Sequence, residues 1–160
     1  MIAERNKVIA ALYNYINQPV IINPQTTNRP PYPFIGYTVT TVSMKEDNEY
    51  GNIIESDSVN DIKQTLEYND NMMISFTAYS LNMAEAYNIA SKAYEFFKFA
   101  GLQTLEDENL VVVDTMNVET RDILEVDAYE RRAGFDVRIR FKKQIDRIIP
   151  AIETYTIKEV

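Results

Sequence analysis

The strictest pattern of apolar and polar positions runs from Tyr129 to Lys143, where the two kinds of residue alternate without a break. A period of two with one apolar face predicts a long antiparallel strand, half buried and half exposed to water. Its polar face is a row of cations, although the chain as a whole is acidic. One face carries Arg131, Ala133, Phe135, Val137, Ile139 and Phe141, and the other carries Arg132, Gly134, Asp136, Arg138, Arg140 and Lys142.

Four further segments are predicted to be strands from their β-branched and aromatic content or their alternation. They are Phe34 to Met44, Val59 to Tyr68, Met72 to Ser80 and Leu110 to Val118. We expect a turn at Asn69-Asp70-Asn71 between the second and third segments, because Asn and Asp favour turn conformations. A polar connection from Glu119 to Asp127 is expected to lead into the long final strand.

Two segments have the spacing of amphipathic helices. The first runs from Ile2 to Asn17 and is ended by Asn17 and Pro19. The second begins at Asn82, which has the residue type of an N-cap, and Glu85 stands three residues on as in a capping box. It is expected to end just before Gly101, the predicted C′ residue. The predicted seam of this helix consists of Met83, Ala86, Ala90, Ala93 and Phe97.

Three stretches are predicted to be irregular. Five of the six prolines lie between Pro19 and Pro33, which favours a stiff, extended connector over a ligand for an aromatic groove. Residues 45–58 form an expected exposed acidic loop, and residues 144–160 form an apolar tail without a clear period. The sequence therefore predicts one α+β domain over residues 1–160, a mainly antiparallel sheet flanked by two helices in the order α-β-β-β-α-β-β plus the tail.

The amino-acid composition excludes several classes of protein function. With 46% hydrophobic and 25% charged residues, the 160-residue chain is typical of a folded globular protein. It contains no apolar run near the roughly 18 residues of a membrane span and no signal-peptide pattern, so we expect a cytoplasmic product without membrane partners. There is no Cys and no His, which excludes disulfides, Cys-ligated zinc and triads that use histidine. We predict no catalytic activity and no cofactor.

Candidate ligand sites in the sequence are weak. Gly51 could occupy the sixth position of a calcium loop, but Glu46, Tyr50 and Asp57 then depart from the required ligand pattern. The four glycines are scattered singly, so no Gly-rich phosphate-binding loop is present. Pairs of carboxylates are abundant among 24 acidic residues, and abundance alone does not indicate a glycosidase.

The cation row has three interpretations on chemistry alone. It pairs across its own sheet with Glu67, Glu119 or Asp136, it contacts nucleic acid, or it meets an acidic surface of another copy. Nucleic-acid binding is the least favoured, because the net charge is −8 and the sequence pI is about 4.6. The candidate interface residues are Arg132, Arg138, Arg140 and Lys142 in the row and Glu46, Asp47, Glu49, Glu55 and Asp57 in the acidic loop.

Several short segments of the sequence, taken in order, resemble the neck or tail terminator proteins of long-tailed bacteriophages. The resemblance covers most of the chain from the first helix through the last long strand, but not residues 45–68 or the C-terminal tail. It contains no catalytic signature. The matching segments are Tyr13 to Ile21, Arg29 to Pro33, Ser75 to Ser80, Val111 to Val113 and Tyr129 to Arg140.

This resemblance implies a structural virion protein that forms a ring, commonly of six subunits, at the head-proximal end of the tail tube. The implied partners are further copies of the chain, the major tail tube protein and the head-completion proteins of the neck. DNA would only pass through the lumen, and assembly would take place in the host bacterial cytoplasm. The alternative from another class is a monomeric adaptor that captures a peptide with an edge strand or its apolar tail.

Overall fold

The computed structural model describes residues 2–23, 29–44, 50–57, 61–124 and 129–150. The chain divides into two compact units. The larger unit comprises Met1–Met44 and Asn71–Phe141, and the smaller unit comprises Lys45–Asp70 and Lys142–Val160. Two long strands, β4 (Asp61–Ser80) and β8 (Tyr129–Pro150), contribute residues to both units.

The sheet of the larger unit confirms the predicted α+β class. Its strands follow the order β1-β2-β4-β8-β5, where β1 is Val20–Ile22, β2 is Phe34–Met44 and β5 is Leu110–Thr115. The β1–β2 pair is parallel, whereas β2–β4 and β5–β8 are antiparallel. Two short strands, β6 (Glu119–Thr120) and β7 (Ile123–Leu124), pair with the beginning of β8.

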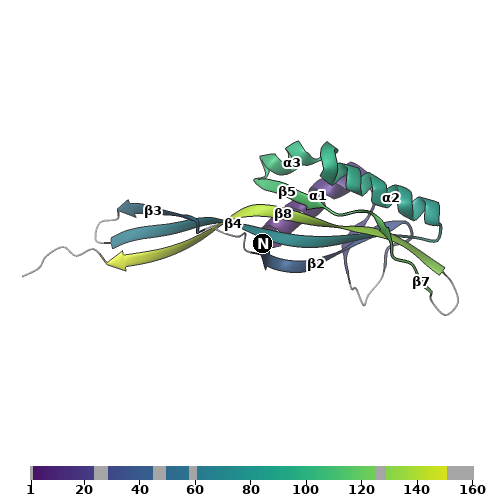
Figure 1. Cartoon of the computed structure of the whole chain (residues 1–160), viewed down its shortest axis with the longest axis horizontal. Coiled ribbons are helices and arrows are strands. Elements are labelled where there is room, and N and C mark those ends of the chain that lie inside the picture. The colour runs from purple at the N-terminus through teal and green to yellow at the C-terminus, as the bar shows by residue number, and fades with distance from the viewer. Residues whose placement is uncertain (1, 24–28, 45–49, 58–60, 125–128, 151–160) are drawn as a thin grey trace, which may run out of the picture. The chain divides into compact units, whose positions relative to one another are not determined.

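Helices cover one face of this sheet and bury its apolar side chains (Figure 1). The helices are α1 (Ile2–Ile16), α2 (Met83–Glu95), the π-helix η1 (Phe96–Ala100) and α3 (Leu102–Asp107). The alternation along β8 is confirmed, because its predicted apolar positions from 133 to 141 are at most 4% exposed. They pack with the small-residue seam of α2, and Phe97 and Tyr94 contact the Phe135 ring edge-on.

The ends of the predicted helices agree with the structure in part. Asn17 ends α1 in the left-handed region, at φ 57°. Asn82 caps α2 by accepting a hydrogen bond from the Ala84 N–H at 2.8 Å. The predicted capping box is wrong, because the Asn82 N–H donates to Ser80 Oγ at 3.0 Å, and the Ser80 hydroxyl in turn donates to Glu85.

The predicted C′ role of Gly101 is also wrong. The helix passes into the π-helix η1, and Gly101 has φ −99°, outside the left-handed region. Glycine is required there for space, since a Cβ would lie 2.2 Å from the Phe96 ring. The chain then continues into α3, which the sequence analysis did not predict.

The predicted turn at residues 69–71 is wrong, because β4 runs through it without a break. Asp70 and Asn71 are buried at 2% and 1% exposure, and each side chain makes a polar contact with another strand. Asn71 Nδ2 donates to the Met44 carbonyl at 3.2 Å, and Asp70 accepts from Lys143 Nζ at 3.4 Å. Residues with a local preference for turns are held in a strand here by partners from other strands.

The smaller unit corrects two further predictions. Residues expected in the acidic loop form β3 (Asn52–Asp57), which pairs antiparallel with residues 62–67 of β4. Residues 144–150, expected in an irregular tail, continue β8. Loop residues 45–49 and 58 and tail residues 151–160 lie outside the described part of the chain. The extended connector also contains β1, which hydrogen-bonds to β2.

Candidate subunit interface on the polar face of the sheet

The polar face of the larger sheet lies opposite the helices and combines hydroxyl groups with charged side chains. In β4 it presents Ser75 and Thr77, and in β8 it presents the predicted cation row. Within the larger unit the row is half-buried, because Arg132, Arg138 and Arg140 lie partly against neighbouring strands. Solvent therefore screens these charges only in part. The protein groups that pair with them determine which ligands this face can bind.

Arg121, which sequence analysis did not single out, lies across this face. Its Nη1 donates to Ser75 Oγ at 2.7 Å, and its Nη2 donates to Asp136 Oδ1 at 3.0 Å. Gly134 provides the space, since a Cβ there would lie 2.5 Å from the Phe76 carbonyl oxygen and 3.0 Å from Arg121 Nη1. Asp136 is therefore used by an arginine outside the predicted row.

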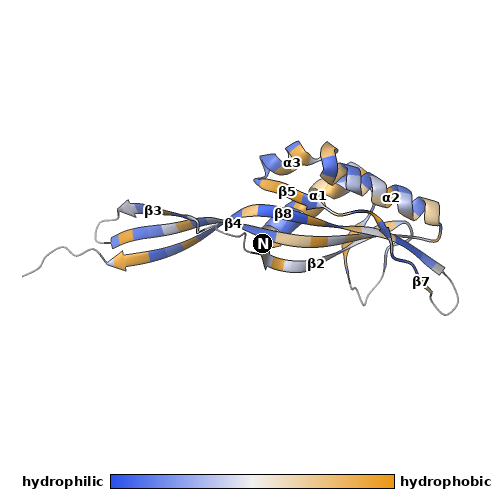
Figure 2. Ribbon diagram, viewed as in Figure 1, coloured by the Kyte–Doolittle hydropathy of each residue, from blue (hydrophilic) through white to orange (hydrophobic). Residues whose placement is uncertain are grey.

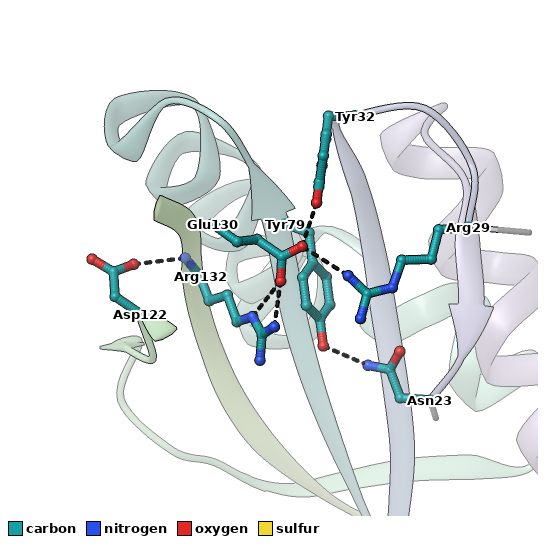
Figure 3. Close-up of polar contacts among 7 residues, drawn as sticks. All are labelled: Asn23, Arg29, Tyr32, Tyr79, Asp122, Glu130 and Arg132. Atoms are coloured by element: carbon teal, nitrogen blue, oxygen red, sulfur yellow. Dashed lines mark hydrogen bonds and ion pairs between the residues drawn. The ribbon is translucent and has the colours of Figure 1, made fainter. Parts of the chain in front are cut away.

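Glu130 is the centre of a second polar network at the start of β8 (Figure 3). Its side chain is only 3% exposed, and it accepts hydrogen bonds from Arg29 Nη1 at 2.9 Å and from Arg132 Nε at 2.6 Å. The Tyr32 hydroxyl also donates to it. One buried carboxylate thus receives two guanidinium groups and a phenol, which compensates for its desolvation.

The environment of Tyr32 raises the pKa of its hydroxyl. Burial is the main cause, and the hydrogen bond to Glu130 and the negative charge of that carboxylate act in the same direction. Arg29 opposes the shift. This contact ties the Pro-rich connector to β8, two segments about a hundred residues apart in the chain.

Arg132 belongs to this network. Its side chain is 15% exposed, it is paired with Glu130, and its guanidinium lies 5.0 Å from the centre of the Tyr79 ring. Its backbone N–H donates to Asp122 Oδ1 at 2.7 Å, and Asp122 also pairs with Arg131 at 3.0 Å. The first cation of the predicted row is thus bound inside its own subunit.

Arg138 differs from Arg132. It stands opposite Asp114 in the β5–β8 register, but its Nε is buried and has no hydrogen-bond partner among the described residues. Arg140 stands opposite Val111 in the same register. Of the acidic partners considered from sequence, Asp136 binds Arg121 and Glu67 accepts a hydrogen bond from Gln144.

The remaining predicted interface residues belong to the smaller unit. Lys142 is exposed and lines an open hollow of about 300 Å³ together with Tyr68 and Glu67. Glu55 is exposed and accepts a hydrogen bond from Gln64. The side chain of Asp57 lies outside the described part, as do all of Glu46, Asp47 and Glu49.

Neither a metal site nor a membrane-spanning helix is present among the described residues. Among the described residues, no group of three or more acidic, His or Cys side chains is arranged to hold a metal ion. No helix in the described part of the chain has both the length and the apolar character needed to cross a membrane.

Comparison with known proteins identifies the family. A sequence model of the phage neck terminator protein matches residues 6–160, nearly the whole chain. No curated protein matches the chain. Because the family match spans both units, the chain belongs to the phage neck terminator protein family, whose members are structural proteins of the phage neck.

Proposed function

We propose that six copies of this chain form a ring that closes the head-proximal end of the phage tail tube and joins it to the head-completion proteins. The family match over residues 6–160 is the observation that carries the proposal. The protein acts by assembly and has no catalytic role. It is assembled in the host cytoplasm and remains in the virion at the junction of neck and tail.

The charge of the chain supports transient passage of DNA through such a ring. Six copies at −8 each carry about −48 before counterions. Tight binding of DNA depends on cations that neutralise its phosphates and release counterions. A strongly acidic ring therefore lets DNA pass without holding it.

The subunit contact is proposed to join the remaining cations of the β8 row to acidic groups of the next copy. Arg132 is bound to Glu130 in its own subunit. The proposed contact uses Arg138, whose Nε has no hydrogen-bond partner among the described residues, together with the neighbouring Arg140 and Lys142. The acidic segment from Glu46 to Asp57 is the first candidate partner. Each exposed pair contributes only about 0.2–1 kcal/mol, but a closed ring repeats the contact at every interface.

The oligomeric state tests the ring itself. Native mass spectrometry or sedimentation of the purified protein, alone and after mixing with isolated tail tubes, should show a closed oligomer in at least the second condition. Electron microscopy should then show it at one end of each tube. A protein that stays monomeric in both conditions and binds a short peptide would instead be an adaptor, and the ring proposal would be wrong.

Charge reversal tests the contact. Arg138→Glu combined with Arg140→Glu should leave the subunit folded by circular dichroism but prevent capping of tail tubes. Opposite reversals at Glu55 and Asp57 should restore capping. The matched control is Lys98→Glu, an exposed cation on η1, which should cap normally. Normal capping by the Arg138/Arg140 variant at low and high salt would exclude this contact.

A further inference from the structure

The described residues of the smaller unit form a three-stranded antiparallel sheet in which each outer strand pairs on one side only. β4 lies in the middle, with β3 on one side and residues 142–150 of β8 on the other. Among the described residues β3 pairs only with β4, and the β5 partnership of β8 ends at Phe141. Both outer strands thus present backbone N–H and C=O groups that can pair with another strand.

The two outer strands carry exposed apolar side chains and are opposite in charge. The exposed fractions are 61% for Ile53 and 49% for Ile54 in β3, and 51% for Ile145 and 70% for Ile148 in β8. Figure 2 shows hydrophobic residues at the end of β8. β3 contains two acidic residues and no basic one, whereas residues 142–150 contain three basic residues and one acidic one. β3 also lacks the Lys and Pro residues that usually protect an edge strand.

One row of side chains across the three strands shows that these charges are not paired with each other. Gln64 in the middle strand donates to Glu55 on one side and accepts from Arg147 Nε at 2.6 Å on the other. The neutral amide separates the two charged groups, so within one copy neither contacts an opposite charge through this row. Glu55 lies in one outer strand and Arg147 in the other, so an opposite charge from another copy can approach each of them.

We propose that the β3 edge of one copy pairs with residues 142–150 of β8 in the next copy, so that the small sheets continue around the ring. This inference rests on the ring of the proposed function. It gives Glu55 a different partner, Arg147, so it is an alternative to the contact with Arg138 and Arg140 proposed above. Pairing of two different edges is head-to-tail and gives a ring when the rotation between copies closes, whereas pairing of like edges gives two-fold dimers. Two β3 edges would bring acidic residues together, and two β8 edges would bring basic residues together, so charge favours the head-to-tail arrangement.

The direction of the new strand pair follows from the topology. β3 is antiparallel to β4. Contacts of Thr65 with Asp146 and of Glu67 with Gln144 show that this part of β8 is also antiparallel to β4. β3 and β8 therefore point the same way, and rotation about a ring axis preserves the component of a strand's direction along that axis. The contact between copies is a parallel pair, in which Glu55 of one copy and Arg147 of the next share a face in every register that keeps Ile53 and Ile145 on one face.

Cysteine crosslinking tests this pairing, because the natural sequence contains no Cys. We would combine Ile53→Cys in turn with a Cys at 143, 145, 147 or 149, which covers registers two residues apart. Oxidation of assembled protein on tail tubes should give a ladder of linked chains in at least one combination, reversed by reductant. A bond within one chain is excluded, since these positions are two strand spacings apart, about 9–10 Å, beyond the reach of a disulfide of about 7 Å.

The outcomes separate this inference from the proposed function. Single variants Ile53→Cys and Ile145→Cys should remain unlinked, and efficient dimers from either one would indicate like-edge pairing and overturn the inference. If unmodified protein caps tubes but no combination gives a ladder, the edge pairing is wrong and the ring stands. If unmodified protein never assembles, the ring proposal itself fails.

A charge exchange gives an independent measurement. Arg147→Glu should abolish capping, and adding Glu55→Arg should restore it, since Gln64 can bond either charge through its amide oxygen or nitrogen. Failure of the second change to restore capping, with both variants folded, would argue against contact between these two edges.

Discussion

Glu130 offers the sharpest test of how the polar face is held together. The carboxylate is 3% exposed and binds Arg132, whose side chain is 15% exposed, as well as the half-exposed Arg29. Removing one partner of a buried ion pair costs about 3–5 kcal/mol, because the other charge stays buried without compensation. Glu130→Gln keeps the shape but removes the charge and directs an amide N–H₂ toward donors. We expect a loss of about 3 kcal/mol in the free energy of unfolding.

Urea unfolding followed by circular dichroism measures this loss. With a denaturant slope of about 2 kcal/mol per molar, the midpoint should fall by about 1.5 M. The matched control is Glu119→Gln, an exposed glutamate in the nearby β6, which should change the unfolding free energy by less than about 0.5 kcal/mol. Equal midpoints for the two variants would refute the structural role assigned to Glu130.

A double substitution separates charge pairing from packing. Arg132→Met in the Glu130→Gln background removes the cation that the first change leaves unpaired, so part of the lost stability should return. The coupling energy of such neighbours lies in the range of about 0.5–3 kcal/mol. Purely additive losses would mean that Arg132 does not depend on Glu130, and Arg132 would return to the set of candidate interface cations.

Three further predictions concern the core, pH and metals. Phe135→Ala should lower the free energy of unfolding, measured in urea, by about 3–5 kcal/mol. Phe99→Ala, at a position 82% exposed, should lower it by less than about 0.5 kcal/mol. Similar losses for the two variants would contradict the prediction that this face of β8 is buried. The raised pKa of Tyr32 contributes stability that is fully present below its ordinary pKa of about 10 and is lost as pH rises through the raised value. Tyr32→Phe should therefore weaken the fall in stability above about pH 10, and an unchanged pH profile would argue against it. EDTA should leave the melting temperature unchanged, and a drop restored by one divalent ion would reveal a missed metal site.

Local patterns in the sequence were sufficient to predict those strands and helices whose residue preferences match their position in the fold. The alternation from Ala133 to Phe141 identified the buried face of β8, because one side of that strand meets the helices and the other does not. Asn82 was identified as a cap because its side chain bonds a backbone group only two residues away. The resemblance to neck terminators, confirmed over residues 6–160, also came from the residues alone.

Tertiary structure decided what depends on distant partners. Asn71 sits in a strand because it bonds the end of β2, which overrides its local preference for a turn. Arg132 looked like one member of an exposed row, but Glu130 holds it together with Arg29, a residue 101 positions from Glu130 in the chain. No local pattern records such a partner, since side chains that meet across a fold need no fixed spacing in the sequence. For the same reason β3 was not predicted, since its strand conformation follows from its pairing with β4.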